Sequence, residues 1–231
     1  MEKHPLVIFH YFLGFITLSV GCFAIFIPKR WKDHRLVGLP YLILYTILLL
    51  SGFLIAFIFD PYPLKAVEYF MITENCWGVA LLVRAYSAAR LRRFSLKARR
   101  YNLILSLFVL ALSLFTIIQG YFVGYQIVMG VGLFLALASG KEALEIYYSN
   151  KSNHNSLYDH YYSMSMTTLL LIFNGKGFFG IRAMFDQQGD VSILSVLAFT
   201  SPFFILMLIL ALLKPYVKYK SLNFPMDSHK G

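Results

Sequence analysis

The chain has 231 residues, of which 58% are hydrophobic and 14% charged, and its formal net charge is +10. A soluble domain carries about 25% charged residues, so this composition leaves too little polar sequence for a water-facing surface and excludes an ordinary soluble fold. The basic residues stand in short groups between apolar runs, which is typical of membrane proteins and excludes a nucleic-acid-binding protein. The mean hydropathy of +0.65 indicates lipid as the solvent.

Seven apolar stretches suit helices that cross a bilayer core, which takes about 20 residues each. In chain order they run from about Leu6 to Ile27, Val37 to Phe59, Ala66 to Ala88, Tyr101 to Gln119, Gly124 to Ser139, Ser163 to Phe185 and Ser192 to Leu213. The third is less apolar than its neighbours and the fifth is short. Their continuous apolar character favours helices over the alternating strands of a membrane barrel. We therefore predict one all-α domain over residues 1–231, a polytopic membrane helix bundle.

Basic residues between the stretches predict the orientation of the bundle. With seven helices, the groups within 29–35, 90–100, 141–151 and 214–230 all fall on one side, and Lys3 and Lys65 fall on the other. Because Lys and Arg concentrate in cytoplasmic loops, the N-terminus is expected outside and the C-terminus in the cytoplasm. The basic loops would face anionic lipid headgroups, which attract each Lys or Arg by about 1 kcal/mol.

Small residues recur at helical spacing in two stretches and mark places where helices approach closely. They are Gly14 and Gly21 in the first stretch, and Gly132, Ala136 and Gly140 in the fifth. One functional hypothesis follows from them: an accessory protein that assembles a membrane complex and uses the small-residue face of the fifth helix as its interface.

Ionisable side chains inside the third and sixth stretches are costly in lipid and therefore indicate a site. Glu74 lies about 12 Å below the outer end of its helix, and Lys176 lies about 13 Å below the same face, at 1.5 Å per residue. Glu68 and Arg182 both lie near the outer end. These depths predict that the third and sixth helices are neighbours, with Glu74 paired to Lys176 and a weaker pair between Glu68 and Arg182.

The predicted charge pairs allow two interpretations. They are structural ion pairs that hold two helices in register, or they line a polar cavity that receives a small polar or anionic ligand from the outer face. Gly175 and Gly177 would let the backbone line such a cavity, and His10, about one turn inside the first helix, would lie near its entrance. The second interpretation makes the protein a non-enzymatic carrier or sensor, without catalytic residues.

Two histidines suggest another kind of site. His34 and His160 precede the second and sixth stretches on the expected cytoplasmic side, where they can meet. Two imidazoles can ligate haem or a metal ion, and Asp159 is either a further ligand or the cap of the sixth helix. His10 is expected at the opposite face and cannot share that ion. A pair that binds haem or a metal would make the protein a haem- or quinone-linked redox protein; the alternative is that both histidines are structural residues at the membrane interface. The sequence contains no closely spaced metal-binding, phosphate-binding or nucleophile motif.

Several short passages carry a resemblance to a known family. They are Phe9 to Gly14, His34-Arg35 with Gly38 and Tyr41, Arg84-Ala85-Tyr86, Asp159 to Met164, and Thr200-Ser201-Pro202. Together they resemble uncharacterised bacterial multi-spanning membrane proteins, the domain of unknown function 2306 family. The resemblance implies a small helical protein of the bacterial plasma membrane, with His10, His34 and His160 as recurring histidines, and it implies no activity. The chain departs from the family pattern around Lys176, where a longer apolar run is expected.

Overall fold

The computed structural model describes residues 5–26, 31–58, 65–90, 96–148 and 158–171, together with Ser201, Ile205, Leu208, Ile209 and Leu212. The regular structure in these residues is all helical. The helices are α1 (Pro5–Phe26), α2 (Trp31–Ile58), α3 (Lys65–Arg90), α4 (Leu96–Val123), α5 (Gln126–Tyr148) and a helix over residues 158–171. They follow the first six predicted stretches in order, so the all-α prediction is confirmed for the described residues.

Three of the described helices are long and apolar enough to cross a membrane, over Pro5–Ala24, Leu36–Phe57 and Lys97–Val123. They also carry exposed large hydrophobic side chains, such as Phe12, which is 63% exposed. A surface with many exposed apolar side chains suits lipid better than water. The second half of the sixth predicted stretch, and the seventh apart from the five single residues, lie outside the described residues.

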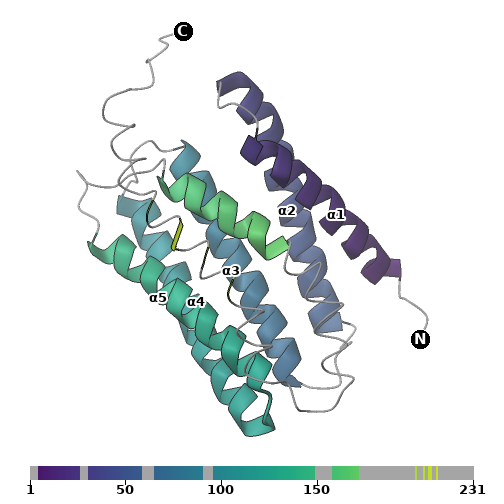
Figure 1. Ribbon diagram of the computed structural model, residues 1–231, viewed down its shortest axis with the longest axis vertical. Helices are drawn as coiled ribbons and strands as arrows, with labels where there is room; N and C mark the ends of the chain where they lie inside the picture. The colour runs from purple at the N-terminus through teal and green to yellow at the C-terminus, as the bar shows by residue number, and fades with distance from the viewer. Residues whose placement is uncertain are drawn as a thin grey trace.

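Helix α3 is central in the bundle. It contacts α2, α4 and α5, and the 158–171 helix, green in Figure 1, lies against it through an ion pair between Arg84 and Asp159. Among the described side chains of α3, Tyr86 is the single exposed large hydrophobic residue. Because neighbouring helices cover α3, it does not need an apolar surface against lipid. Its central position explains why the third predicted stretch is less apolar than the others.

The turn between α4 and α5 depends on a glycine. Gly124 has a φ of 76°, a left-handed conformation that costs other residues about 1–2 kcal/mol. Its N–H donates to the carbonyl of Tyr121 at 3.1 Å, and the N–H of Tyr125 donates to the carbonyl of Gly120 at 2.8 Å. These two hydrogen bonds give partners to backbone carbonyls at the end of α4 and stabilise the turn at which the chain changes direction.

Small residues mark helix contacts within this chain, as predicted. A Cβ atom on Gly132 would lie 2.9 Å from Cγ1 of Ile117 in α4, and one on Gly21 would lie 2.6 Å from Cε2 of Tyr41 in α2. Side chains at these two positions would push the helices apart. The face of α5 that the accessory hypothesis assigns to a partner is therefore covered by α4 at Gly132.

Helix α5 is longer than predicted. The sequence predicts an end near Ser139 with Lys141 in a loop, whereas α5 continues to Tyr148. On this extension Lys141 and Glu145 form an ion pair at 3.4 Å, and Glu142 is only 1% exposed. The loop assignment of Lys141 is wrong because the polar residues of this segment pair inside the bundle instead of facing water.

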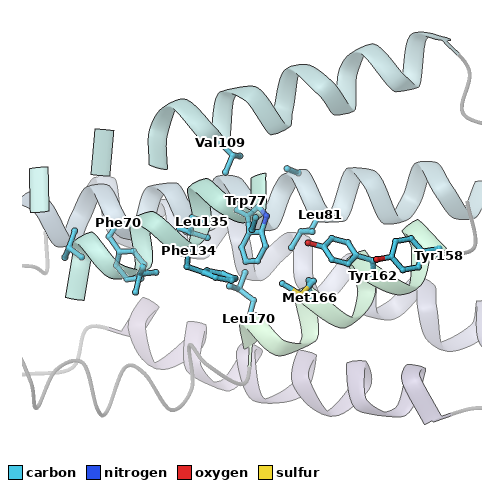
Figure 2. Close-up of a cluster of buried hydrophobic side chains, with 14 residues drawn as sticks. Phe70, Trp77, Leu81, Val109, Phe134, Leu135, Tyr158, Tyr162, Met166 and Leu170 are labelled. Carbon is cyan, nitrogen blue, oxygen red and sulfur yellow. The ribbon is translucent and has the colours of Figure 1, made fainter. Parts of the chain in front are cut away.

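Two clusters of buried side chains form the core, and the 158–171 helix contributes to both. The first, shown in Figure 2, lies between α3, α4, α5 and the 158–171 helix, and in it Trp77 stands edge-on to Phe134 with ring centroids 5.6 Å apart. The second joins α1, α2, α3 and the 158–171 helix. The members contributed by that helix are Tyr158, Tyr162, Met166 and Leu170 in the first cluster, and Met164 and Leu171 in the second. This helix thus connects the two parts of the core.

Candidate functional site

His34 and His160 meet at one end of the bundle, which the predicted layout of the spans allows. We call this the basic end: α2 and α4 begin there, α3 and α5 end there, and Lys97 and Arg100 are exposed on the first turns of α4. The Nε2 atoms of the two histidines are 3.5 Å apart. Their ring centroids are 5.8 Å apart and the ring planes are nearly perpendicular, at 81°. Residues 126 positions apart in the chain are thereby brought together edge to edge.

The hydrogen bond at the other nitrogen of His160 determines its tautomer. Nδ1 of His160 lies 3.2 Å from the backbone carbonyl oxygen of Ala85. A carbonyl only accepts, so Nδ1 carries the hydrogen and donates it. In the neutral imidazole the lone pair then resides on Nε2, the atom that faces His34. Metal-binding histidines are commonly oriented in this way, by a carbonyl or carboxylate at the second nitrogen.

An ion pair next to both partners fixes this arrangement. Arg84 precedes Ala85 in α3, and Asp159 precedes His160 in the 158–171 helix. The Nη2 atom of Arg84 donates to Oδ1 of Asp159 at 2.5 Å, and both side chains are buried. Asp159 is therefore engaged with Arg84, and the structure favours neither of the two roles predicted for it, metal ligand or helix cap.

The separation of the two imidazoles is compatible with one shared metal ion. Metal–nitrogen bonds of about 2.0–2.1 Å place two ligand nitrogens at most about 4.2 Å apart. A spacing of 3.5 Å corresponds to an N–metal–N angle of roughly 120°, nearer a tetrahedral than a linear arrangement. Within the described residues, no group of three or more His, Cys, Asp or Glu side chains could hold a metal ion. A metal at this position would have two described protein ligands, His34 and His160, and open coordination positions.

A buried ion network lies beside the histidines and was missed from the sequence. We use this name for Arg84, Lys141, Glu142, Glu145 and Asp159. Besides Asp159, the guanidinium of Arg84 lies 3.4 Å from Oε2 of Glu145 and 3.9 Å from Oε2 of Glu142. Trp77 Nε1 and the Tyr162 hydroxyl each donate to Oε1 of Glu142 at 3.3 Å. The network joins α3, α5 and the 158–171 helix.

One sequence signal could have revealed the α5 part of this network. The segment 141–148 contains good helix formers and an i,i+4 pair of Lys141 and Glu145, which favours continuation of a helix. Because the segment is polar, it resembles a loop when a membrane span is sought by hydropathy alone. The partners of Arg84 in α5 and in the 158–171 helix lie 58 to 75 positions further along the chain, and no local pattern identifies such partners.

The predicted outer-face site is described only in part. Glu74 is buried in α3, where its side chain is 7% exposed. Glu68 lies in the first turn of α3 and is partly buried. Their predicted partners, Lys176 and Arg182, lie outside the described residues, so both ion pairs stay predictions.

His10 connects α1 to α2. Its Nδ1 atom is 2.7 Å from Oγ of Ser51, and that hydroxyl donates to the carbonyl of Leu48 at 2.8 Å. The Ser51 oxygen therefore accepts from His10. Ser51 is 17 residues after His34 in α2, about 25 Å along the helix axis. His10 therefore lies too far from His34 to share an ion with it.

Comparisons with known proteins provide no relative: no family model, curated protein or solved structure matches the chain.

Proposed function

We propose that the chain is a membrane redox protein whose transition-metal centre is bound by His34 and His160. One observation carries the proposal: the two Nε2 atoms lie 3.5 Å apart at the end of the bundle. Imidazole nitrogen is the usual protein ligand for zinc, copper, iron and nickel, and a redox role requires copper or iron among these.

The surrounding residues suit a metal ligand. The Ala85 carbonyl holds His160 with its Nε2 lone pair toward His34, within hydrogen-bond distance of Nε2 of that residue. The buried ion pair of Arg84 and Asp159 anchors the residues on either side of that hydrogen bond. Open coordination positions would let the metal exchange electrons with, or bind, a small molecule such as a quinone or oxygen.

The membrane arrangement is part of the proposal. Seven spans, with the N-terminus outside and the C-terminus in the cytoplasm, would put the basic end on the cytoplasmic side of the bacterial plasma membrane. Support comes from the three apolar helices and from the grouping of basic residues on one side of the predicted spans. The metal centre would then lie near the cytoplasmic headgroups.

Metal analysis of the purified protein tests the proposal. We expect about one equivalent of copper or iron in the detergent-purified protein, and loss of most of it in His34→Ala and in His160→Ala, because each variant removes one of two ligands. His10→Ala is the matched control, since His10 is bonded to Ser51 far from the pair. An absorption spectrum distinguishes haem iron from a single metal ion, because haem gives a Soret band and a single ion does not. Metal content unchanged in both variants would contradict the proposal.

A polar ligand bound from the outer face is the second candidate function, and the burial of Glu74 favours it. Ionisable side chains inside membrane bundles commonly mark ligand pathways. In this function Lys176 binds the ligand with Glu74, and Glu68, Arg182 and His10 lie near the entrance. Lys176→Met would abolish binding or uptake while the protein stays folded. Normal uptake by that variant would exclude this candidate.

A further inference from the structure

Glu142 is the most deeply buried acid of the ion network. It is 1% exposed and lies in α5, opposite Trp77 of α3 and Tyr162 of the 158–171 helix. An ionised carboxylate in such a place loses its hydration and needs strong charged partners in exchange. The nature of its partners therefore indicates its protonation state.

Both hydrogen-bond donors to Glu142 are neutral and both reach the same oxygen. Trp77 Nε1 and the Tyr162 hydroxyl donate to Oε1, each at 3.3 Å. A protonated carboxyl has one carbonyl oxygen that accepts and one hydroxyl oxygen that carries the proton. In a protonated Glu142, these two donors make Oε1 the carbonyl oxygen and Oε2 the hydroxyl oxygen.

The nearest cation, Arg84, lies too far from Glu142 to form a hydrogen bond with its carboxyl group. Nη1 of Arg84 stays 3.9 Å from Oε2, whereas a guanidinium bonded to a carboxylate lies about 2.7–2.9 Å away. Within the described part of the chain this buried Nη1 atom has no hydrogen-bond acceptor, although it is the guanidinium nitrogen that approaches Oε2. Arg84 instead directs Nη2 to Asp159 at 2.5 Å. An ionised Glu142 would attract Nη1 into contact, so the gap indicates a neutral carboxyl.

We propose that Glu142 is held as a protonated carboxyl and is a proton-binding site inside the bundle. Arg84 of α3 and Tyr162 of the 158–171 helix face Glu142 directly. The other charged groups of the network surround it at one remove: Asp159 and Glu145 contact Arg84, and Lys141 contacts Glu145. Ionisation of Glu142 leaves a carboxylate and releases one proton, with no redox step. The proposal uses neither histidine and stands whether or not a metal binds there.

Glu145 offers the route by which the proton exchanges with water. It lies three residues further along α5, on the same side of the helix as Glu142, and its side chain is 22% exposed. Its carboxylate contacts Arg84 and Lys141, both at 3.4 Å. A proton leaving Glu142 toward the basic end passes this partly solvated carboxylate first. Chains of carboxyl groups of this kind serve as proton relays in membrane proteins.

Infrared difference spectroscopy tests the proposal, because the C=O stretch of a protonated carboxyl is separate from the bands of carboxylates and shifts in heavy water. We expect the full-length protein in lipid vesicles to show such a band, and Glu142→Gln to lack it. The side-chain amide that this substitution introduces can still accept hydrogen bonds from Trp77 and Tyr162, so the variant should remain folded.

A second variant covers the case in which Glu142→Gln does not fold. Tyr162→Phe removes one donor to the carbonyl oxygen, so the same band should persist and move to higher frequency. Glu74→Gln is the control, since Glu74 is a buried acid of α3 outside the network. A protonated-carboxyl region that is identical in wild type, Glu142→Gln and Tyr162→Phe, or a band lost only in Glu74→Gln, would overturn the proposal.

Discussion

Arg84 is the residue on which the described buried charges converge. Its guanidinium approaches three carboxyl groups, from α5 and from the 158–171 helix, and lies 5.4 Å from the ring centroid of Tyr162. Arginine suits this position because its planar group makes several directed hydrogen bonds and cannot be deprotonated in a protein. The side chain therefore links α3 to two helices whose contacting residues lie 58 to 75 positions further along the chain.

Replacing Arg84 should strongly destabilise the protein. In Arg84→Met, the buried Asp159 loses its 2.5 Å partner, and removing one member of a buried ion pair costs about 3–5 kcal/mol. Lys97→Met is the control, because Lys97 is exposed on the first turn of α4 and surface substitutions change stability by about 0.5 kcal/mol or less. Thermal unfolding in detergent should show a large fall in Tm for Arg84→Met and a small change for Lys97→Met. Equal Tm values for the two variants would contradict this account of the network.

At the scale of single residues, some of the site could be predicted and some could not. The layout of the predicted spans puts His34 and His160 on one side and so allows them to meet, but the sequence does not specify their contact. Arg84 stands out as a charge within an apolar stretch, but its partners could not be inferred, because they depend on how α5 and the 158–171 helix pack. Glu142 was missed since its segment looks polar enough for a loop.

Helices α4 and α5 form a hairpin in which two glycines have distinct roles. Gly124 provides the left-handed turn. Gly132 lets α5 approach the backbone of α4, where an added Cβ would lie 3.2 Å from the nitrogen of Ile117. Close approach strengthens dispersion contacts, which matter in lipid because there is little hydrophobic driving force between helices.

Two glycines of α5 should respond differently to substitution. Gly132→Ala would place a methyl group 2.9 Å from Cγ1 of Ile117, whereas the same change at Gly140 meets Leu110 only at 3.9 Å. Overpacking costs about 1–3 kcal/mol, while Gly→Ala in an open helix position gains about 0.5–1 kcal/mol. We expect Gly132→Ala to lower Tm and Gly140→Ala to leave it unchanged or raise it. A stabilised Gly132→Ala would show that the two helices do not pack this closely.

The existence and order of the elements were the most predictable part of the fold. Continuous apolar runs indicated α1, α2 and α4 directly, because these helices carry large apolar surfaces. The end of α5 was misjudged, since the sequence predicts Ser139 and the helix ends at Tyr148. Hydropathy detects exposure to lipid and not helicity. A helical segment whose polar residues pair inside the bundle is therefore not recognised by its hydropathy.

The described part of the chain is a helix bundle with a charged, hydrogen-bonded interior at its basic end. The 158–171 helix connects the two core clusters and contributes both His160 and Asp159. Both the proposed metal centre and the proposed proton site depend on its position. An arrangement with the two sites side by side would suit a protein that moves electrons and protons on the same side of a membrane.

Reporter fusions test the orientation of the whole chain. The proposed seven-span topology predicts that a reporter active only in the cytoplasm works at the C-terminus and fails at the N-terminus, because seven spans would put the ends on opposite sides and the basic segments would face the cytoplasm. A reporter active only outside the cytoplasm serves as the reciprocal control at both positions. Cytoplasmic activity at both ends would require an even number of spans and would refute the seven-helix topology.

Pulsed electron paramagnetic resonance of the copper(II)-loaded protein tests the proposed metal centre, because it counts the imidazoles bound to one ion through their remote nitrogens. We expect two imidazoles in the wild-type protein, one in His34→Ala and one in His160→Ala, and two in His10→Ala. Two imidazoles retained in either single variant, or none in the wild type, would contradict a centre built on His34 and His160.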